Sequence, residues 1–137
     1  MSILIKSFAL HFVLFGVLDA IWWGYIANKF FIDEMGHIAK MVEGKPNLNL
    51  YAGLVVYVVM SMMLSVFVVK NPMTDSAYKA ALFGALIGVG LFATYEFTNL
   101  SIIADYPIKF ALVDTAWGTF MCSLLGLASY KFFLENH

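Results

Sequence analysis

The sequence predicts an all-α integral membrane protein, folded as a bundle of four membrane-spanning helices. The 137 residues are 62% hydrophobic and only 12% charged, whereas soluble domains average about 25% charged residues. Four long apolar stretches alternate with polar links. Backbone polar groups in lipid must be hydrogen-bonded within the protein, so apolar runs of this length form helices. Residues 1–137 are therefore expected to form a single transmembrane domain.

The four spans are expected at about residues 7–27, 49–69, 78–100 and 108–134. A span needs about 20 apolar residues to cross a hydrocarbon core roughly 30 Å thick. The first span is expected to be a retained helix and not a signal peptide. It is too long for a signal sequence, it contains Asp19, and Trp22 and Trp23 stand where a cleavage site has small residues.

The link between the first two spans carries an amphipathic pattern. Apolar residues recur at positions 31, 35, 38 and 42, which is helical spacing, opposite a polar face. The pattern predicts a short interfacial helix over residues 31–42 that partly covers the mouth of a cavity on this side. An ordinary exposed loop is the alternative, because Gly36 destabilises a helix by about 1 kcal/mol.

Small residues recur in the third and fourth spans. Gly84 and Gly88 are four residues apart, and Gly118, Cys122 and Gly126 repeat the same spacing. Such ladders allow membrane helices to approach closely. As the single cysteine of the chain, Cys122 cannot form an internal disulfide and is expected to pack as a small residue.

Charge and motif content exclude several classes of function. The chain contains no Arg and has a formal net charge of −1, so no nucleic acid is expected as a partner. No cluster of His and Cys has the spacing of a zinc site, and we predict no metal site and assign no cofactor. The lysines divide equally between the two sides of the membrane, so they do not define an orientation.

Three acids lie within the spans, namely Asp19, Glu96 and Asp114, and no lysine lies deep in any span. A carboxylate at the centre of a membrane helix costs about 2.5–3.5 kcal/mol on insertion scales, and such residues usually face the bundle interior and serve a function. Counting along helices of alternating direction puts all three acids in the half of the membrane next to the long link. We expect them to line one cavity together with Asn99, open to that side.

The candidate ligand-binding residues all fall in this half of the membrane, and they are Asp19, Trp22, Tyr57, Tyr95, Glu96, Asn99, Asp114 and Trp117. Carboxylates, an amide and aromatic rings suit a lipid, a small amphipathic ligand or a cation, and membrane lipids are the expected partners. Hydrogen bonds that only join the helices are the structural alternative. The opposite half, which contains His11, is expected to be a dry aliphatic base.

Other functions remain open from the residues alone. Glu96 and Asp114 are candidate catalytic residues of an acid–base enzyme of lipid modification, although the sequence favours a binding protein over an enzyme. A small proton- or cation-coupled transporter would act as a homo-oligomer at this length, and a polar path through both halves would favour it. A structural subunit of a membrane complex is the remaining alternative.

Four sequence blocks resemble the bacterial membrane-protein family called domain of unknown function 2177. They are Leu18-Asp19-Ala20-Ile21-Trp22, Leu50-Tyr51 with Val56-Tyr57, Tyr95-Glu96-Phe97-Thr98-Asn99-Leu100, and Asp114-Thr115-Ala116-Trp117-Gly118. The blocks span nearly the whole chain, with one departure at Glu96, where the family pattern has Asp. The resemblance implies four membrane helices in a bacterial inner membrane, and it implies no activity.

Overall fold

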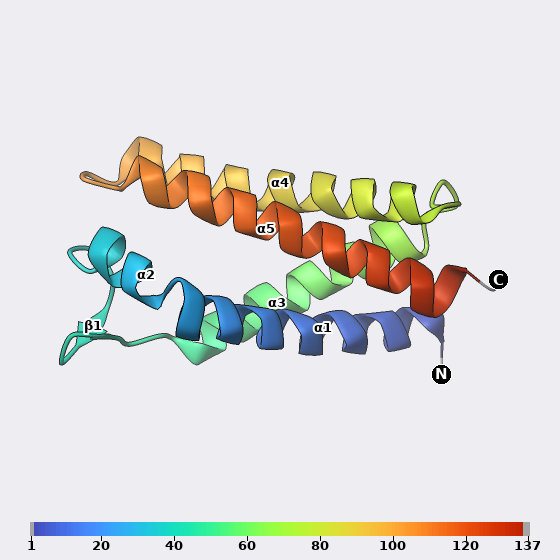
Figure 1. The fold of residues 1–137 in the computed structure, drawn as a ribbon, viewed down its shortest axis with the longest axis horizontal. Coiled ribbons are helices and arrows are strands. Elements are labelled where there is room, and N and C mark those ends of the chain that lie inside the picture. The colour runs from blue at the N-terminus through green and yellow to red at the C-terminus, as the bar shows by residue number, and fades with distance from the viewer. Residues whose placement is uncertain (1, 136–137) are drawn as a thin grey trace.

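The computed structural model describes residues 2–135 and confirms an all-α, four-helix architecture. The four long helices are α1 (Ile3–Ile21), α3 (Leu50–Leu64), α4 (Ala77–Ile102) and α5 (Ile108–Ser129). Three of them continue into one π-helical turn each: η1 (Trp22–Ile26), η2 (Ser65–Val69) and η3 (Tyr130–Leu134). Both termini lie at one end of the bundle and the long link lies at the other (Figure 1).

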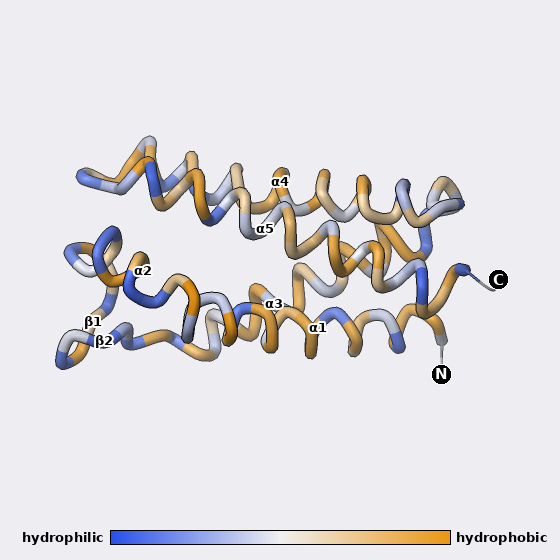
Figure 2. Tube along the Cα trace, in the orientation of Figure 1, coloured by the Kyte–Doolittle hydropathy of each residue, from blue (hydrophilic) through white to orange (hydrophobic). Residues whose placement is uncertain are grey.

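Four helices are long and apolar enough to cross a membrane, and they cover Ile3–Ile26, Leu50–Val69, Ala77–Ile102 and Ile108–Leu134. Hydrophobic residues follow their lengths, and hydrophilic residues gather at the two ends (Figure 2). The first helix begins at Ile3, ahead of the expected Ser7, because the Ser2 hydroxyl caps it by accepting from the Ile5 N–H. Asn49 caps α3 in the same way.

Helices α4 and α5 pack most closely, side by side along their lengths (Figure 1). A Cβ on Gly84 would overlap the Cys122 carbonyl, and one on Gly88 would lie 2.6 Å from the Gly118 carbonyl oxygen. A Cβ on Gly126 would likewise overlap a carbonyl of α4. The small-residue ladders therefore bring the two backbones together as expected, and larger side chains would force them apart.

The interfacial helix is present but has different bounds. Helix α2 covers Asn28–Met35, so the predicted helix over residues 31–42 is wrong beyond Met35. Strands β1 (Met41–Val42) and β2 (Lys45–Pro46) form a small antiparallel hairpin instead. Its two-residue turn, Glu43-Gly44, has φ of 49° and 73°, the left-handed geometry of a tight hairpin turn. Between Met35 and the hairpin the chain forms a turn, in which the Ile38 and Ala39 N–H groups donate to the Met35 carbonyl.

The apolar face of α2 is covered by protein. Phe31 and Met35 pack against a buried cluster of Tyr106, Phe110 and Ala111 at the beginning of α5. Burial of these aromatic side chains supplies the stabilisation that a helix of this length lacks on its own. Helix α2 is thereby fixed over the end of the bundle, beside the loop that joins α4 to α5.

The two ends of the bundle are packed differently. At the end that holds the termini, η2 contacts α1, α4, α5 and η3. At the long-link end, α3 runs obliquely and makes few contacts with α4. The buried core lies between these ends and includes Phe15, Leu64, Met121 and Leu125. The bundle is thus closed at one end and leaves room between α3 and α4 at the other.

Candidate functional site

A cavity of about 470 Å³ lies between α3 and α4 in the half of the bundle next to the long link. Asp19 of α1 and Asp114 of α5 both line it, so two of the three intramembrane acids face one space. The remaining lining residues are apolar or aromatic and come from α3, α4 and η1: Val55, Val56, Val59, Met60, Leu91, Phe92, Tyr95 and Trp23. The carboxylates are therefore the charged groups of an otherwise apolar pocket.

Each oxygen of the Asp19 carboxylate accepts one hydrogen bond. Tyr57 Oη donates to Oδ2 at 3.0 Å, and Trp117 Nε1 donates to Oδ1 at 3.0 Å. The Trp117 ring stacks on Trp22, with ring centroids 4.4 Å apart and planes within 5°. Residues from η1, α3 and α5 therefore fix this carboxylate in place at the cavity wall.

Glu96 lies behind Asp114 and does not line the cavity. Its side chain has no solvent exposure, and Tyr106 Oη donates to Glu96 Oε2 at 2.6 Å. Asp114 is the neighbouring acid, and the two carboxyls lie close enough for the protonation of one to depend on the other. Within residues 2–135 the other oxygen, Oε1, has no hydrogen-bond partner. Two acids this close cannot both be ionised at low dielectric without a large penalty.

Tyr106 belongs to the loop between α4 and α5, and it extends the carboxyl pair toward the long-link end of the bundle. Burial and the hydrogen bond to Glu96 raise the pKa of its hydroxyl, so it remains a donor across the physiological range. Asn99 also contacts this hydroxyl. No pattern in the sequence indicates this role, because only the fold of the loop brings Tyr106 back to Glu96.

The expected ligand-binding residues therefore occupy three kinds of position. Asp19, Tyr95 and Asp114 line the cavity. Tyr57, Trp117 and Trp22 hold or support Asp19, while Glu96 and Asn99 lie behind the cavity with Tyr106. Trp23 lines the cavity and was not among the expected residues. Trp23 follows Trp22 at a helix end, and this position is equally typical of an interfacial aromatic belt. The sequence alone therefore did not identify Trp23 as a cavity residue.

The opposite half of the bundle, expected to be nearly all aliphatic and phenylalanine, contains one buried polar cluster around His11. His11 is fully buried, and its Nδ1 lies 3.1 Å from Ser65 Oγ and 3.4 Å from the Ser61 carbonyl oxygen. Its Nε2 contacts Ser129 Oγ. We call His11, Ser61, Ser65 and Ser129 the histidine cluster. A buried histidine with both nitrogens partnered joins α1, α3, η2 and α5.

Hydrogen-bond counting allows two tautomers of His11. When the Ser129 hydroxyl donates its single proton to the Leu125 carbonyl at 2.9 Å, it accepts from Nε2, and Nδ1 accepts from Ser65. In the other tautomer Nδ1 carries the proton and donates to the Ser61 carbonyl at 3.4 Å, and Ser129 donates to Nε2. The ring thus has a donor on one side and an acceptor on the other.

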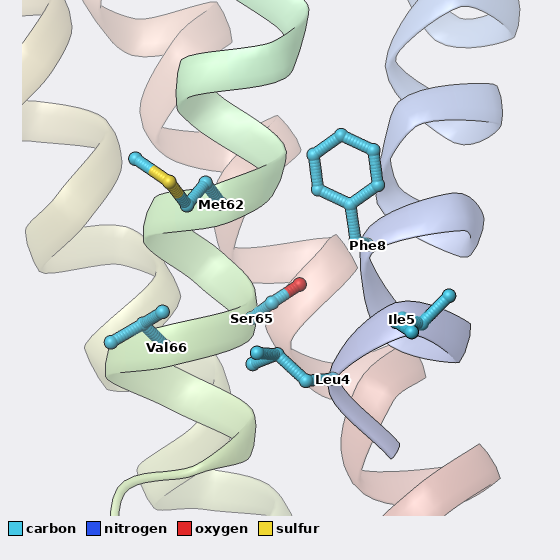
Figure 3. A pocket seen from close by; sticks show the side chains of 6 residues that line it. All are labelled: Leu4, Ile5, Phe8, Met62, Ser65 and Val66. Atoms are coloured by element: carbon cyan, nitrogen blue, oxygen red, sulfur yellow. The ribbon is translucent and has the colours of Figure 1, made fainter. Parts of the chain in front are cut away.

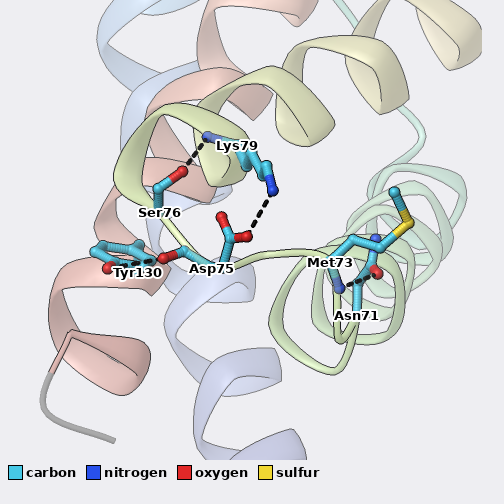
Figure 4. A network of polar contacts seen from close by, with 6 residues as sticks. All are labelled: Asn71, Met73, Asp75, Ser76, Lys79 and Tyr130. Atoms are coloured by element: carbon cyan, nitrogen blue, oxygen red, sulfur yellow. Dashed lines mark hydrogen bonds and ion pairs between the residues drawn. The ribbon is translucent and has the colours of Figure 1, made fainter.

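Two further features lie at the end of the bundle that holds the termini. An apolar groove of about 180 Å³ runs beside Ser65 and is lined otherwise by Leu4, Ile5, Phe8, Met62 and Val66 (Figure 3). On the surface, Lys79 Nζ donates to Asp75 Oδ2 at 2.6 Å, and Tyr130 Oη donates to the Asp75 carbonyl at 3.4 Å (Figure 4). The groove offers little polar recognition, and the surface network is an exposed connection between η3 and the start of α4.

Comparison with known proteins identifies a family and no characterised relative. The chain belongs to the family of predicted membrane proteins DUF2177, whose model matches residues 4–131. With its four apolar helices it is a multi-pass membrane protein. No curated protein matches the chain, and no solved structure does.

Proposed function

For this member of the DUF2177 family, we propose that the cavity between α3 and α4 binds an amphipathic ligand with a cationic headgroup, with an amine-bearing lipid of a bacterial inner membrane as the natural candidate. The observation that carries the proposal is the cavity itself, which combines apolar walls with two carboxylates. Such a pocket is complementary to a molecule with a hydrocarbon part and a positive charge.

The apolar walls account for the hydrocarbon part of the ligand. Val59, Met60 and Leu91 face the cavity from α3 and α4, and they offer no hydrogen-bonding side chain. Its volume of about 470 Å³ lies within the usual range for small-molecule pockets, roughly 300–1,000 Å³. An acyl chain or short alkyl group would bury apolar surface there, at about 25 cal/mol per Å².

The two acids would bind the positively charged headgroup of the ligand. Asp19 and Asp114 line the cavity, and no lysine does. An ammonium group between them would neutralise carboxylates that otherwise lie without a basic partner, and the low dielectric strengthens that attraction. Trp23 and Tyr95 also line the cavity, and aromatic faces attract ammonium groups.

The ligand can enter sideways from the lipid. Val55, Val56 and Tyr95 line the cavity, yet they are 63%, 51% and 62% exposed on the outer surface of the bundle. Because α3 and α4 make few contacts with each other, their facing sides form a lateral opening. A membrane amphiphile would pass its head inward to the acids and leave the rest of its tail in the bilayer.

Native mass spectrometry of the purified protein tests the proposal. We expect the wild type to retain an amine-bearing amphiphile, and Asp114→Asn and Asp19→Asn to retain about tenfold less, the loss expected for roughly 1.4 kcal/mol of binding. Asp75→Asn is the matched control, because it makes the same chemical change on the exposed surface outside the cavity. Equal retention by Asp114→Asn and Asp75→Asn would overturn the proposal.

The carboxyl pair favours one second candidate, acid–base chemistry on a bound lipid. Asp114 faces the cavity and Glu96 supports it from behind, so Asp114 could exchange a proton with the ligand while Glu96 accepts or returns it. In this case, lipid incubated with the wild type in deuterated water would gain mass as a carbon-bound proton is removed and replaced by deuterium, whereas lipid incubated with Asp114→Asn would not. Retention of unmodified lipid by the wild type supports binding alone.

A further inference from the structure

Polar and ionisable side chains follow one face of α1 along the axis of the bundle. Ser7, His11, Phe15 and Asp19 are spaced four residues apart, which puts them on one stripe of the helix. Ser7, His11 and Phe15 are fully buried, and Asp19 faces the cavity. Phe15 is the apolar member of this stripe.

At the long-link end the stripe joins a chain of proton-bearing groups. Tyr106 donates to Glu96 at 2.6 Å, and Glu96 contacts Asp114, which shares the cavity with Asp19. Tyr57 then donates to Asp19 at 3.0 Å. These contacts lead from the loop between α4 and α5 into the middle of the bundle.

At the other end the histidine cluster continues the chain. Nδ1 of His11 lies 3.1 Å from the Ser65 hydroxyl oxygen, and Nε2 contacts the Ser129 hydroxyl. Ser61 lies one turn after Tyr57 on α3; it is fully buried, and within residues 2–135 its hydroxyl has no hydrogen-bond partner. It is therefore free to bond a water or a neighbour between Tyr57 and His11.

One apolar layer separates the two ends. Asp19 and His11 are eight residues apart on α1, or about 12 Å along the helix axis. Phe15 lies between them with its ring parallel to that of Tyr57, the two centroids 6.3 Å apart. Leu64 and Met121 belong to the same fully buried core. The two polar ends would be connected when water enters this layer or when the Phe15 ring rotates.

We propose that the axis of the bundle is a proton path, with the carboxylates at one end, the histidine cluster at the other and Phe15 as the gate between them. Each group releases one proton as it takes up another, so no bond other than O–H or N–H bonds changes and no electron is transferred. The proton gradient across the membrane supplies the driving force. The path uses the acids of the cavity but does not require that the cavity bind a ligand.

The environment of His11 suits this role. Its hydrogen-bond partners are the hydroxyls of Ser65 and Ser129 and the carbonyl of Ser61. A ring that accepts at one nitrogen and donates from the other can take up a proton on one side and release one on the other, after which its neutral form is restored. Hydroxyls on either side can rotate to repeat the transfer.

Proton flux into liposomes tests the proposal. The full chain is reconstituted in vesicles that contain a pH-sensitive dye, and a potassium diffusion potential drives protons inward. We expect flux above that of protein-free vesicles, an increase of about fivefold in Phe15→Ala, and a loss of about tenfold in His11→Gln, which keeps hydrogen bonding but does not titrate. Phe8→Ala is the matched control, because Phe8 lines the outer groove.

Two controls distinguish proton conduction from general leakage of the vesicles and from the proposed ligand binding. Vesicles must retain an entrapped anionic dye in all variants, which excludes general leakage. Equal flux in Phe15→Ala, Phe8→Ala and protein-free vesicles would overturn the proton path, even if His11→Gln does not fold. Ligand retention is measured on the same preparations, so a wild-type preparation that conducts protons but retains no amphiphile contradicts the binding function alone.

Discussion

The two polar clusters of the bundle differ in what surrounds them. The histidine cluster is enclosed by helices: every side chain is almost fully buried, and both ring nitrogens of His11 have partners, although within residues 2–135 the Ser61 hydroxyl has none. In the carboxylate half, one oxygen of Glu96 has no partner within residues 2–135, and Asp114 faces a cavity. One cluster is closed, and the other is open on one side.

This difference follows from helix packing. Around His11, η2 contacts α1, α4, α5 and η3, so hydroxyls of η2 and α5 and a carbonyl of α3 reach one ring. Around the acids, α3 diverges from α4 and leaves the cavity. A fully paired polar group stabilises the contact between helices, whereas an acid buried without a basic partner is unfavourable. An open cluster of acids is therefore better explained by what it binds than by packing.

The largest expected effect on stability is at the closed cluster. His11→Ala removes a fully buried ring and leaves two hydroxyls without their partner, so we expect it to lower the free energy of unfolding by about 2–4 kcal/mol. Unfolding in mixed micelles, with increasing denaturing detergent, measures this. A loss below about 0.5 kcal/mol would mean that the cluster does not join the helices, since a single membrane hydrogen bond contributes that much.

A smaller loss is expected behind the open cluster. Tyr106→Phe removes the hydroxyl that Glu96 Oε2 accepts from and leaves the buried carboxyl without that donor. We expect a loss of about 1–2 kcal/mol, as for other orphaned buried groups. The same unfolding assay checks it, and Tyr25→Phe is the control because Tyr25 is 86% exposed. Equal stability of the two variants would show that the bond does not hold Glu96.

Glu96→Gln should change stability in the opposite direction. The amide keeps the acceptor for Tyr106 and gains N–H donors beside Asp114, while it removes an acid that has no basic partner. The expected result is a free energy of unfolding equal to the wild type or higher by up to about 1 kcal/mol. A loss comparable to that of Tyr106→Phe would mean that the ionisable form of Glu96 stabilises the fold.

The smallest effect is expected at Asp75. The hydrogen bond from Lys79 holds the pKa of this carboxyl below its ordinary value of 3.8. A depressed pKa in the folded state stabilises the protein above the unfolded value and ceases to do so as the pH falls through the folded value. Because the group is fully exposed, we expect the melting temperature of Asp75→Asn to match that of the wild type at pH 7. A clear decrease would show that the surface network holds α4 in place.

The sequence was sufficient for the elements whose signals are local. Apolar length predicts the four spans, and the spacing of Gly84 and Gly88 predicts the close approach to α5. The end of α2 was missed because apolar spacing continues beyond Met35, while the turn at Glu43 and Gly44 determines where the hairpin forms. Local periodicity does not report such competition between a helix and a tight turn.

The sites were only partly predictable, because their partners come from distant segments. The depths of Asp19 and Asp114 correctly placed both in one half of the bundle, and they share a cavity. Glu96 was expected on the cavity wall, but it faces Tyr106, whose position depends on the loop. His11 contacts serines 50 to 118 residues away in the chain, and no local pattern shows such contacts.

The contrast between the two clusters is tested most directly by measuring the same two properties on Asp114→Asn and on His11→Ala. For both variants, the free energy of unfolding and the amount of co-purified amphiphile are determined on the same preparation. We predict that Asp114→Asn loses the amphiphile and keeps its stability, whereas His11→Ala loses stability and, where folded, keeps the amphiphile. Loss of stability in Asp114→Asn with its bound amphiphile unchanged would contradict the account and leave the acids as packing groups.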